Sequence, residues 1–250
     1  MPGERIAVVT GASSGIGAAS TRQLARAGFH VVAGARRADR LQPLAEEVGA
    51  TTLPLDVTDP ASVEAFAAAV RDRHGHADVL VNNAGAALGL DRVEAAREEL
   101  WRQMFELNVL GVLRMTRALL PRLLASGDGH VIVVGSTSGF EVYPGGAGYT
   151  ASKHGLRALT RTLRLELLGQ PVRVTEINPG LVETEFSLVR YGGDAERAAV
   201  VYQGMEPLRA EDVAGCIAFA ATRPARCNID EITLRPRDQA SSTQIFRRGQ

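Results

Sequence analysis

The chain has 250 residues and a formal net charge of zero, because 28 Lys and Arg residues balance 28 Asp and Glu residues. With 45% apolar and 22% charged residues, we expect a soluble globular protein of one large or two small domains. The lack of a basic excess argues against a nucleic-acid-binding protein, and no apolar run reaches the length of about 18 residues that predicts a membrane span.

Short β-branched apolar runs alternate with longer amphipathic stretches, as in parallel strands joined by helices. We expect strands over Arg5–Thr10, His30–Gly34, Thr52–Asp56, Asp78–Val81, His130–Gly135, Val172–Ile177 and Ile229–Leu234. We expect helices over Gly15–Ala27, Ala61–Arg73, Glu98–Ala125, Tyr149–Leu168 and Ala210–Ala221, the second of them capped by Asp59 with Pro60 in its first turn. The prediction is an α/β fold: a single Rossmann-type domain over residues 1–250, with a doubly wound parallel sheet of about seven strands and helices on both faces.

The first strand follows directly on residues 1–5, which lack the apolar core of a signal peptide, so we expect a cytoplasmic protein. This strand ends in a glycine-rich turn that opens the first helix. Glycines let the backbone approach a phosphate, and the helix offers its N-terminal amides. A tight turn without a ligand is the alternative, but the position favours dinucleotide binding by Gly11, Ser13, Ser14, Gly15, Ile16 and Gly17.

The end of the second strand is where such folds hold the adenosine ribose, roughly 20 residues further on. The sequence there has Ala35, Arg36 and Arg37, and no acidic side chain that could accept hydrogen bonds from ribose hydroxyls. A guanidinium suits a 2′-phosphate, so Arg36 and Arg37 favour NADP(H) over NAD(H). The alternative is that both arginines are solvated residues at the start of a helix.

Polar and small residues follow the third and fourth strands. Asp56, followed by Val57, could accept a hydrogen bond from an adenine amino group. After the fourth strand, Asn83, Ala84 and Gly85 would allow a ribose to come close. Taken alone, either group is also compatible with ordinary turn chemistry.

Lys153 is the single lysine among the 28 basic residues, and it follows Tyr149 by four positions. On a helix this spacing places the two side chains on one face. A nearby ammonium favours the phenolate, so we expect Lys153 to lower the pKa of Tyr149 from its ordinary value near 10 and to make it an acid/base. Ser136, just past the fifth strand, could hold the same substrate oxygen. These residues predict carbonyl–alcohol chemistry beside a nicotinamide.

Several motifs follow one another along the chain: Thr10-Gly11-x-x-x-Gly15-x-Gly17, Asn82-Asn83-Ala84-Gly85, Asn108, Ser136, Tyr149-x-x-x-Lys153 and Pro179-Gly180. In this order and spacing the chain resembles the short-chain dehydrogenase/reductase family over nearly its whole length. The resemblance implies that Tyr149 is the catalytic acid/base and that Ser136 stabilises the carbonyl oxygen. It implies that Lys153 binds the nicotinamide ribose and that Asn108 holds a proton-relay water. The residues implied to flank the nicotinamide are Pro179, Gly180, Val182 and Thr184.

Residues 82–89, 135–137, 184–194 and 224–232 and the stretch around Gln239 are similar to NADP-dependent serine/3-hydroxy acid dehydrogenases. The same general pattern suits the clavulanate-type aldehyde reductases of antibiotic producers. The loop Leu181–Thr184 is one residue shorter than in the serine dehydrogenase pattern, so the resemblance does not decide the identity of the substrate. We expect an active-site lid around residues 183–206. Its Arg190 is the candidate partner of a substrate carboxylate, with Arg237 second and a solvated surface arginine as the alternative.

The sequence therefore predicts an NADP(H)-dependent oxidoreductase that acts on a 3-hydroxy acid or related small substrate held at Ser136, Tyr149 and Arg190. The alternatives are a biosynthetic NADPH-dependent aldehyde or ketone reductase and a non-catalytic dinucleotide-sensing protein. The family implies a homo-oligomer, a tetramer or a dimer. We expect no nucleic-acid or membrane partner and no metal, since neither the five histidines nor the two cysteines show ligand spacing.

Overall fold

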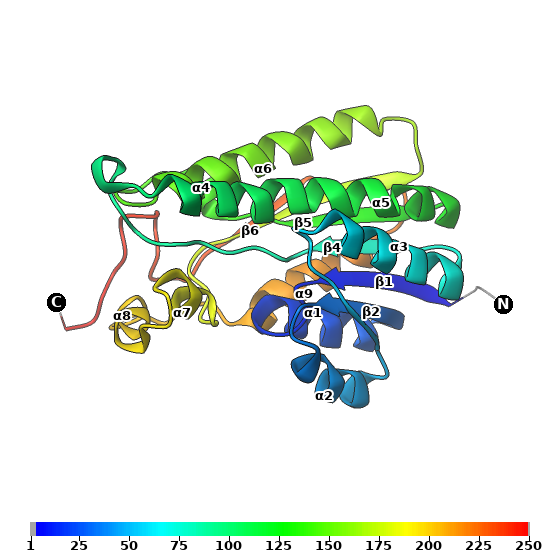
Figure 1. Cartoon of the computed structure of the whole chain (residues 1–250), viewed down its shortest axis with the longest axis horizontal. Helices are drawn as coiled ribbons and strands as arrows, with labels where there is room; N and C mark the ends of the chain where they lie inside the picture. Colours follow the sequence, from blue (N-terminus) through cyan, green and yellow to red (C-terminus); the bar gives the residue numbers. More distant parts are fainter. Residues whose placement is uncertain (1–3, 250) are drawn as a thin grey trace.

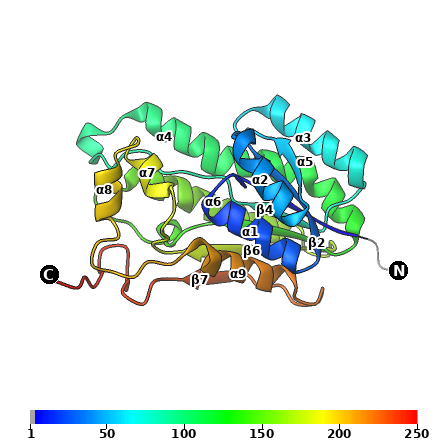
Figure 2. The ribbon, with the colours of Figure 1, turned by 90° about the horizontal axis from the view of Figure 1, so that it is seen from below.

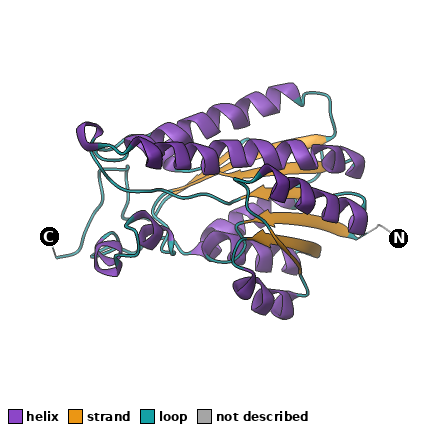
Figure 3. Cartoon of the chain, viewed as in Figure 1, coloured by secondary structure: helices purple, strands orange, loops and turns teal. Residues whose placement is uncertain are grey.

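The computed structural model describes residues 4–249. The prediction that the N-terminal segment is not a signal peptide concerns residues 1–5, of which Met1, Pro2 and Gly3 lie outside the described residues. Parallel strands form one seven-stranded sheet in the order β3-β2-β1-β4-β5-β6-β7 (Figure 3). Strand order reverses between β1 and β4, and sheets of this kind bind ligands beside that point, at the carboxyl ends of the strands. The strands are β1 (Arg5–Thr10), β2 (Phe29–Ala35), β3 (Thr51–Pro54), β4 (Val79–Asn82), β5 (Gly129–Val134), β6 (Val172–Pro179) and β7 (Glu231–Leu234).

Helices cover both faces of the sheet (Figures 1 and 2). Apolar residues of α3, α5 and α6 pack on one face, and those of α1, α2 and α9 pack on the other. The helices are α1 (Gly15–Arg26), α2 (Ala38–Val48), α3 (Pro60–His74), α4 (Glu98–Phe105), α5 (Gly111–Ser126), α6 (Ala147–Glu166), α7 (Phe186–Arg190), α8 (Ala195–Val200) and α9 (Ala210–Ala221). Within residues 4–249, no helix has both the length and the apolar character needed to cross a membrane.

The predicted parallel α/β sheet is confirmed. Both β1 and α9 begin and end where predicted, and the other predicted strands, α1, α3 and α6 differ by at most two residues at either end. The Asp59 carboxylate caps α3 by accepting a hydrogen bond from the Ala61 N–H at 2.9 Å, and Pro60 lies in the first turn. These ends follow from local rules, because caps and apolar periodicity act over a few residues.

The sequence reasoning was wrong where a helix departs from regular periodicity. The stretch Glu98–Ala125 is not one continuous α-helix: α4 and α5 are joined by a π turn, Glu106–Leu110. One inserted residue barely changes an apolar pattern of period 3.6, so the pattern does not reveal the π turn. The prediction also omits α2, which has Pro43 in its interior, where proline ordinarily breaks a helix.

The apolar runs of the strands are continuous because both faces of the sheet are covered. On β1, Ile6 and Val8 pack against the helices of one face, while Ala7 and Val9 pack against those of the other. Successive side chains point to opposite faces, so every position of such a strand is apolar. Each fully buried Val, Leu or Ile contributes about 1.5–3 kcal/mol to stability, and the core thereby holds the strands in register.

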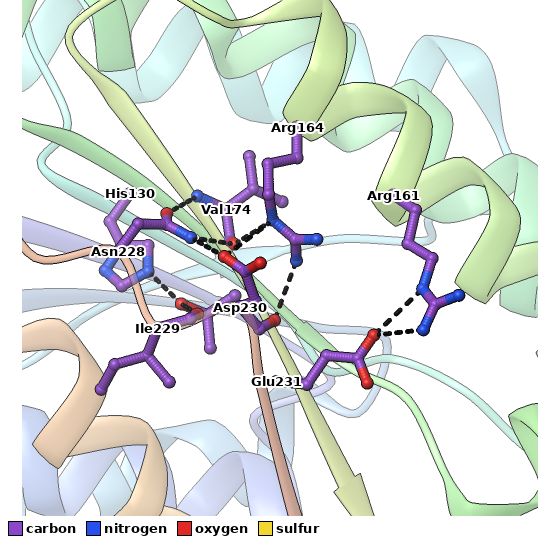
Figure 4. Close-up of polar contacts among 9 residues, drawn as sticks. His130, Arg161, Arg164, Val174, Asn228, Ile229, Asp230 and Glu231 are labelled. Carbon is purple, nitrogen blue, oxygen red and sulfur yellow. Dashed lines mark hydrogen bonds and ion pairs between the residues drawn. The ribbon is translucent and has the colours of Figure 1, made fainter.

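Charged contacts fasten α6 to the edge strand β7 (Figure 4). The Arg161 guanidinium donates two hydrogen bonds to Glu231 Oε1, at 3.0 and 2.9 Å, and Arg164 donates to the Asp230 carbonyl at 2.8 Å. Both arginines belong to the C-terminal half of α6. These bonds therefore fix the position of the whole helix along the sheet, including its N-terminal half, which carries Tyr149.

His130 is a buried histidine on β5. Its Nε2 lies 2.7 Å from the Thr175 hydroxyl, which itself donates to the Ile229 carbonyl at 2.6 Å. The hydroxyl proton is thus in use, and Nε2–H must be the donor. Burial lowers the pKa of His130 to about 3, and the charge of Arg173 acts in the same direction. His130 is therefore neutral in the folded chain at physiological pH.

We expect the free energy of unfolding to fall as the pH drops below about 6.5, because unfolded His130 takes up a proton that the folded chain rejects until about pH 3. In His130→Gln, which keeps a donor for Thr175, the loss between pH 6.5 and 4.5 should be smaller by about 2 kcal/mol. Urea unfolding of both chains at several pH values measures this difference. Equal pH slopes would contradict the assignment.

Candidate functional site

The glycine-rich turn follows β1 at the carboxyl edge of the sheet. Gly11 and Gly15 have φ values of +65° and +51°, which favour glycine over other residues. A Cβ on Gly17 would lie 2.3 Å from the Gly11 carbonyl oxygen, so this position also excludes a side chain. The N-cap of α1, Ser14, makes no side-chain capping bond, which leaves the first amides of the helix free to hold an anion. The turn fits a dinucleotide pyrophosphate.

A basic cluster lies beside this turn. The Arg37 guanidinium donates to Ser13 Oγ at 3.2 and 3.1 Å and to Ser14 Oγ at 2.8 Å. Arg40, one turn into α2, joins Arg37 on a shared carboxylate, Glu185. Sequence reasoning missed Arg40 because it did not predict α2. The arrangement of two arginines and two hydroxyls fits a phosphate monoester.

Arg36, which the sequence analysis predicted as a phosphate partner together with Arg37, is exposed, and its charge acts on Asp56 after β3. Burial opposes ionisation of Asp56, but hydrogen bonds from Thr58 and the charge of Arg36 together lower its pKa below the ordinary value. Asp56 Oδ1 accepts from the Thr58 N–H at 3.0 Å and from its hydroxyl at 2.7 Å. Asp56 is therefore ionised, with its other oxygen, Oδ2, not used by these bonds. Val57 is buried beneath it.

The loop after β4 is tied to the glycine-rich turn. Asn83 Nδ2 donates to the Thr10 carbonyl at 2.9 Å, and the Ala84 N–H donates to the Thr10 hydroxyl at 3.0 Å. A Cβ on Gly85 would lie 3.7 Å from Lys153 Nζ. The three small or polar residues proposed to face a ribose therefore lie between the phosphate turn and Lys153.

Tyr149 and Lys153 lie on one face of α6, and both are buried. Lys153 Nζ donates to the Val134 carbonyl at the end of β5 at 2.9 Å and lies 5.9 Å from the centroid of the Tyr149 ring. Burial lowers the pKa of Lys153 to about 8, opposed by the charge of Glu176. Glu176 on β6 was not singled out in the sequence, although its carboxyl is wholly buried and without a hydrogen-bond partner among the described residues.

The expectation that Lys153 lowers the pKa of Tyr149 is wrong for this structure. Burial raises the pKa of Tyr149 above 10, and a hydrogen bond with Ser136 and the charge of Arg190 only partly oppose it. Burial prevails because the ammonium of Lys153 lies over the ring and bonds to a carbonyl instead of the phenol oxygen. Tyr149 is therefore a proton donor in this arrangement.

Ser136 begins the turn after β5. Its hydroxyl accepts a hydrogen bond from the Ser138 N–H at 3.0 Å, and its own N–H donates to Asn178 Oδ1 at 3.1 Å. The hydroxyl proton is not used by these bonds and can point to Tyr149 or to a substrate oxygen. The turn thus presents Ser136 and Tyr149 to the same place.

Asn108 lies in the π turn between α4 and α5 and is completely buried. Its Nδ2 donates to the Ala86 carbonyl at 2.9 Å and to Ser152 Oγ at 3.0 Å, and its Oδ1 accepts from the Ala86 N–H at 3.0 Å. Its side chain is therefore occupied in joining the loop after β4 to α6. The π turn puts the residue where it can reach both.

The lid covers Tyr149. The Phe186 ring meets the Tyr149 ring edge-on at 5.6 Å, and the Arg190 guanidinium lies 5.8 Å from the Tyr149 centroid and 5.3 Å from that of Tyr143. Arg190 Nε donates to the Gly89 carbonyl at 3.2 Å, while its buried Nη2 has no partner among residues 4–249. Arg237, the second candidate, is exposed and pairs with Asp238, so it does not share this position.

The segment after β6 leads into the lid. Gln239 Oε1 accepts from the Leu181 N–H at 2.8 Å, next to Pro179 and Gly180, and fixes the start of the loop. Val182 pairs with Leu208, and the Thr184 side chain would meet a Cβ on Gly15 at 3.2 Å. Of the residues expected to flank a nicotinamide, Thr184 therefore lies against Gly15 of the glycine-rich turn.

A small pocket opens beside Tyr149. Its volume is about 10 Å³, roughly the space for one water molecule. It is lined by Leu88, Gly89, Asp91, Ala96, Arg97, Leu100, Trp101, Met104, Gly145, Gly148 and Tyr149. In the described part of the chain, no group of three or more His, Cys, Asp or Glu side chains could hold a metal ion.

The model of the short chain dehydrogenase family matches residues 5–190. An uncharacterised oxidoreductase of Mycobacterium tuberculosis is 61% identical over 241 residues, covering 96% of this chain and 94% of that protein. An NADP-dependent 3-hydroxy acid dehydrogenase of Salmonella typhi is 42% identical over 238 residues, covering 94% and 96%. The closed form of a serine dehydrogenase complexed with NADP⁺ matches with a TM-score of 0.92 at 40% identity, covering 97% and 99%.

Asn108→Ala should lower the free energy of unfolding by about 2–3 kcal/mol, because it removes three hydrogen bonds and leaves the Ala86 N–H and carbonyl without their side-chain partner. Urea unfolding measures the loss. The control is Gln103→Ala, an exposed amide on α4, which should change stability by less than about 0.5 kcal/mol. A similarly small effect of both changes would contradict the role given to Asn108.

Proposed function

The chain belongs to the short-chain dehydrogenase family, and we propose that this NADP(H)-dependent oxidoreductase interconverts the hydroxyl and carbonyl groups of a small 3-hydroxy acid. The observation that carries the proposal is a partly buried cation beside the acid/base residue. Arg190 lies against the Tyr149 ring with Nη2 unpaired, so a substrate carboxylate and a reacting oxygen can be held together.

The residues at the carboxyl edge of the sheet fit NADP(H). The glycine-rich turn and the first amides of α1 suit the pyrophosphate, and Arg37, Arg40 and the two serine hydroxyls suit the 2′-phosphate. When bound, the cofactor supplies hydride exchange at the nicotinamide C4. Thr184, which lies against Gly15, would cover the cofactor beside the glycine-rich turn.

The chain itself supplies the proton and the orientation. Tyr149 keeps its proton because burial raises its pKa, and it can therefore pass that proton to a carbonyl oxygen during reduction. The Ser136 hydroxyl, adjacent to Tyr149, can hold the same oxygen. In the oxidation direction Tyr149 must first lose its proton, and the Ser136 bond and the Arg190 charge then stabilise the phenolate.

One observation favours a carboxylate substrate over an uncharged aldehyde or ketone. The cation nearest to Tyr149 on the lid has no acidic partner among residues 4–249. A relative of 42% identity is named for its action on 3-hydroxy acids. A purely dinucleotide-sensing protein would have no use for Tyr149, Ser136 and Lys153 in one place.

Tyr149→Phe should reduce turnover of 3-hydroxy acids with NADP⁺, and of aldehydes with NADPH, by roughly 10²–10⁴-fold, since it removes the only proton that Tyr149 can transfer. Affinity for NADPH should stay within about twofold, because the ring packing remains. Nicotinamide absorbance and fluorescence titration measure the two quantities. Tyr191→Phe, a lid tyrosine that stacks with Arg197, is the matched control and should retain activity. Full turnover in Tyr149→Phe would exclude the proposed mechanism.

Arg190→Gln should raise KM for an L-serine or 3-hydroxy acid substrate by roughly 10- to 100-fold, because a charge-assisted pair with the carboxylate is lost. KM for the corresponding uncharged methyl ester should change little. Arg197→Gln, an exposed lid arginine, serves as the control. If the wild-type enzyme turns over only bulky aldehydes and Arg190→Gln leaves their KM unchanged, the biosynthetic reductase alternative is correct.

A further inference from the structure

A carboxylate of the lid occupies the basic cluster formed by Arg37 and Arg40. Glu185, the residue before α7, accepts from Arg37 Nη1 at 2.9 Å through Oε2 and from Arg40 Nη1 at 2.5 Å through Oε1. Hydrogen bonds from Arg40 and then Arg37 hold the pKa of Glu185 below its ordinary value, so it is ionised at neutral pH. Each carboxylate oxygen thus satisfies one arginine.

Most of the remaining donors of Arg37 are also in use. Nε and Nη2 bond to Ser13, and Nη2 bonds to Ser14. A phosphate that forms more than one hydrogen bond with Arg37 must therefore replace an existing partner. The serine hydroxyls can turn and donate their protons to a phosphate oxygen, but the Glu185 carboxylate can only accept hydrogen bonds and repels an incoming dianion. Glu185 is the partner that has to leave.

We propose that Glu185 is a specificity-determining residue that competes, as a carboxylate built into the lid, with the cofactor's 2′-phosphate for Arg37 and Arg40. This inference rests on the proposed NADP(H) dependence. Without the phosphate, the two arginines hold Glu185, and the lid is tied to the N-terminal end of α2. When the phosphate binds, Glu185 gives up both arginines and the tie is broken.

The competition couples the two ends of the site. Phe186, which packs on Tyr149, directly follows Glu185, and Arg190 lies at the other end of the same short helix, α7. A phosphate that releases Glu185 therefore changes the free energy of the lid conformation over Tyr149. By reciprocity, any substrate that favours one lid conformation alters the affinity for the 2′-phosphate by the same factor.

The test uses adenosine fragments that lack the nicotinamide. Isothermal titration calorimetry compares 2′,5′-ADP, which has the 2′-phosphate, with 5′-AMP, which does not. In the full-length Glu185→Gln chain, the Kd for 2′,5′-ADP should fall by about three- to tenfold, since two partly exposed ion pairs no longer compete. The Kd for 5′-AMP should stay within about twofold. Fluorescence titration should likewise show that Glu185→Gln binds NADPH more tightly than the wild type does, while its affinity for NADH is unchanged.

Two further variants make the result specific. Glu183→Gln removes an exposed lid carboxylate that pairs with no arginine in the described part of the chain, and it should leave both Kd values unchanged. Arg40→Gln should raise the Kd for 2′,5′-ADP. The inference is overturned if Glu185→Gln binds 2′,5′-ADP no more tightly than the wild type, if 5′-AMP gains equally, or if Glu183→Gln has the same effect.

Failure of the proposed function gives a different result. A wild-type chain that binds 2′,5′-ADP no better than 5′-AMP lacks the NADP(H) preference itself, whatever the variants do. If the wild-type chain prefers 2′,5′-ADP but Glu185→Gln does not bind it more tightly, the proposed function stands and only the inference about Glu185 is wrong.

Discussion

A charge buried on α6 is the constraint on which the site depends. The ammonium of Lys153 is almost completely removed from solvent and donates to the Val134 carbonyl at 2.9 Å. An unpaired charge at such a depth would be costly, so the helix must hold Lys153 opposite the end of β5, where a carbonyl is free beyond the last sheet bond. An arginine could not replace it, because its planar guanidinium is larger and does not yield its proton.

The same edge of the sheet holds a second set of buried polar groups. Glu176 and Asn178 point from β6 toward α6, and a Cβ on Gly135 would lie 2.7 Å from Glu176 Oε1 and 2.2 Å from Asn178 Oδ1. Glycine at 135 is therefore a packing requirement. The buried Glu176 carboxyl faces Lys153, whose charge opposes the rise in its pKa that burial causes. The catalytic face of α6 thus rests on polar groups of the sheet as well as on apolar packing.

Fold prediction from the sequence succeeded where a rule acts over a few residues. The strands follow from apolar runs buried on both faces, and α3 begins at Asp59 because a carboxylate caps its first turn. The rules failed at α2, whose interior Pro43 is tolerated in the folded chain, and at the π turn around Asn108. The π turn depends on contacts with distant segments, since Asn108 bonds to Ala86 and Ser152.

The sequence by itself determined the chemical groups of the site: a glycine-rich turn, arginines after the second strand, and a tyrosine four positions before the single lysine. These were recognisable because their spacing lies within one turn or one helix. Tertiary structure alone decided that Arg40 joins Arg37 in the basic cluster, that Glu185 pairs with both, and that Arg190 lies beside Tyr149. It also reversed the expected pKa shift of Tyr149, because burial is produced by the whole fold and outweighs a single neighbouring charge.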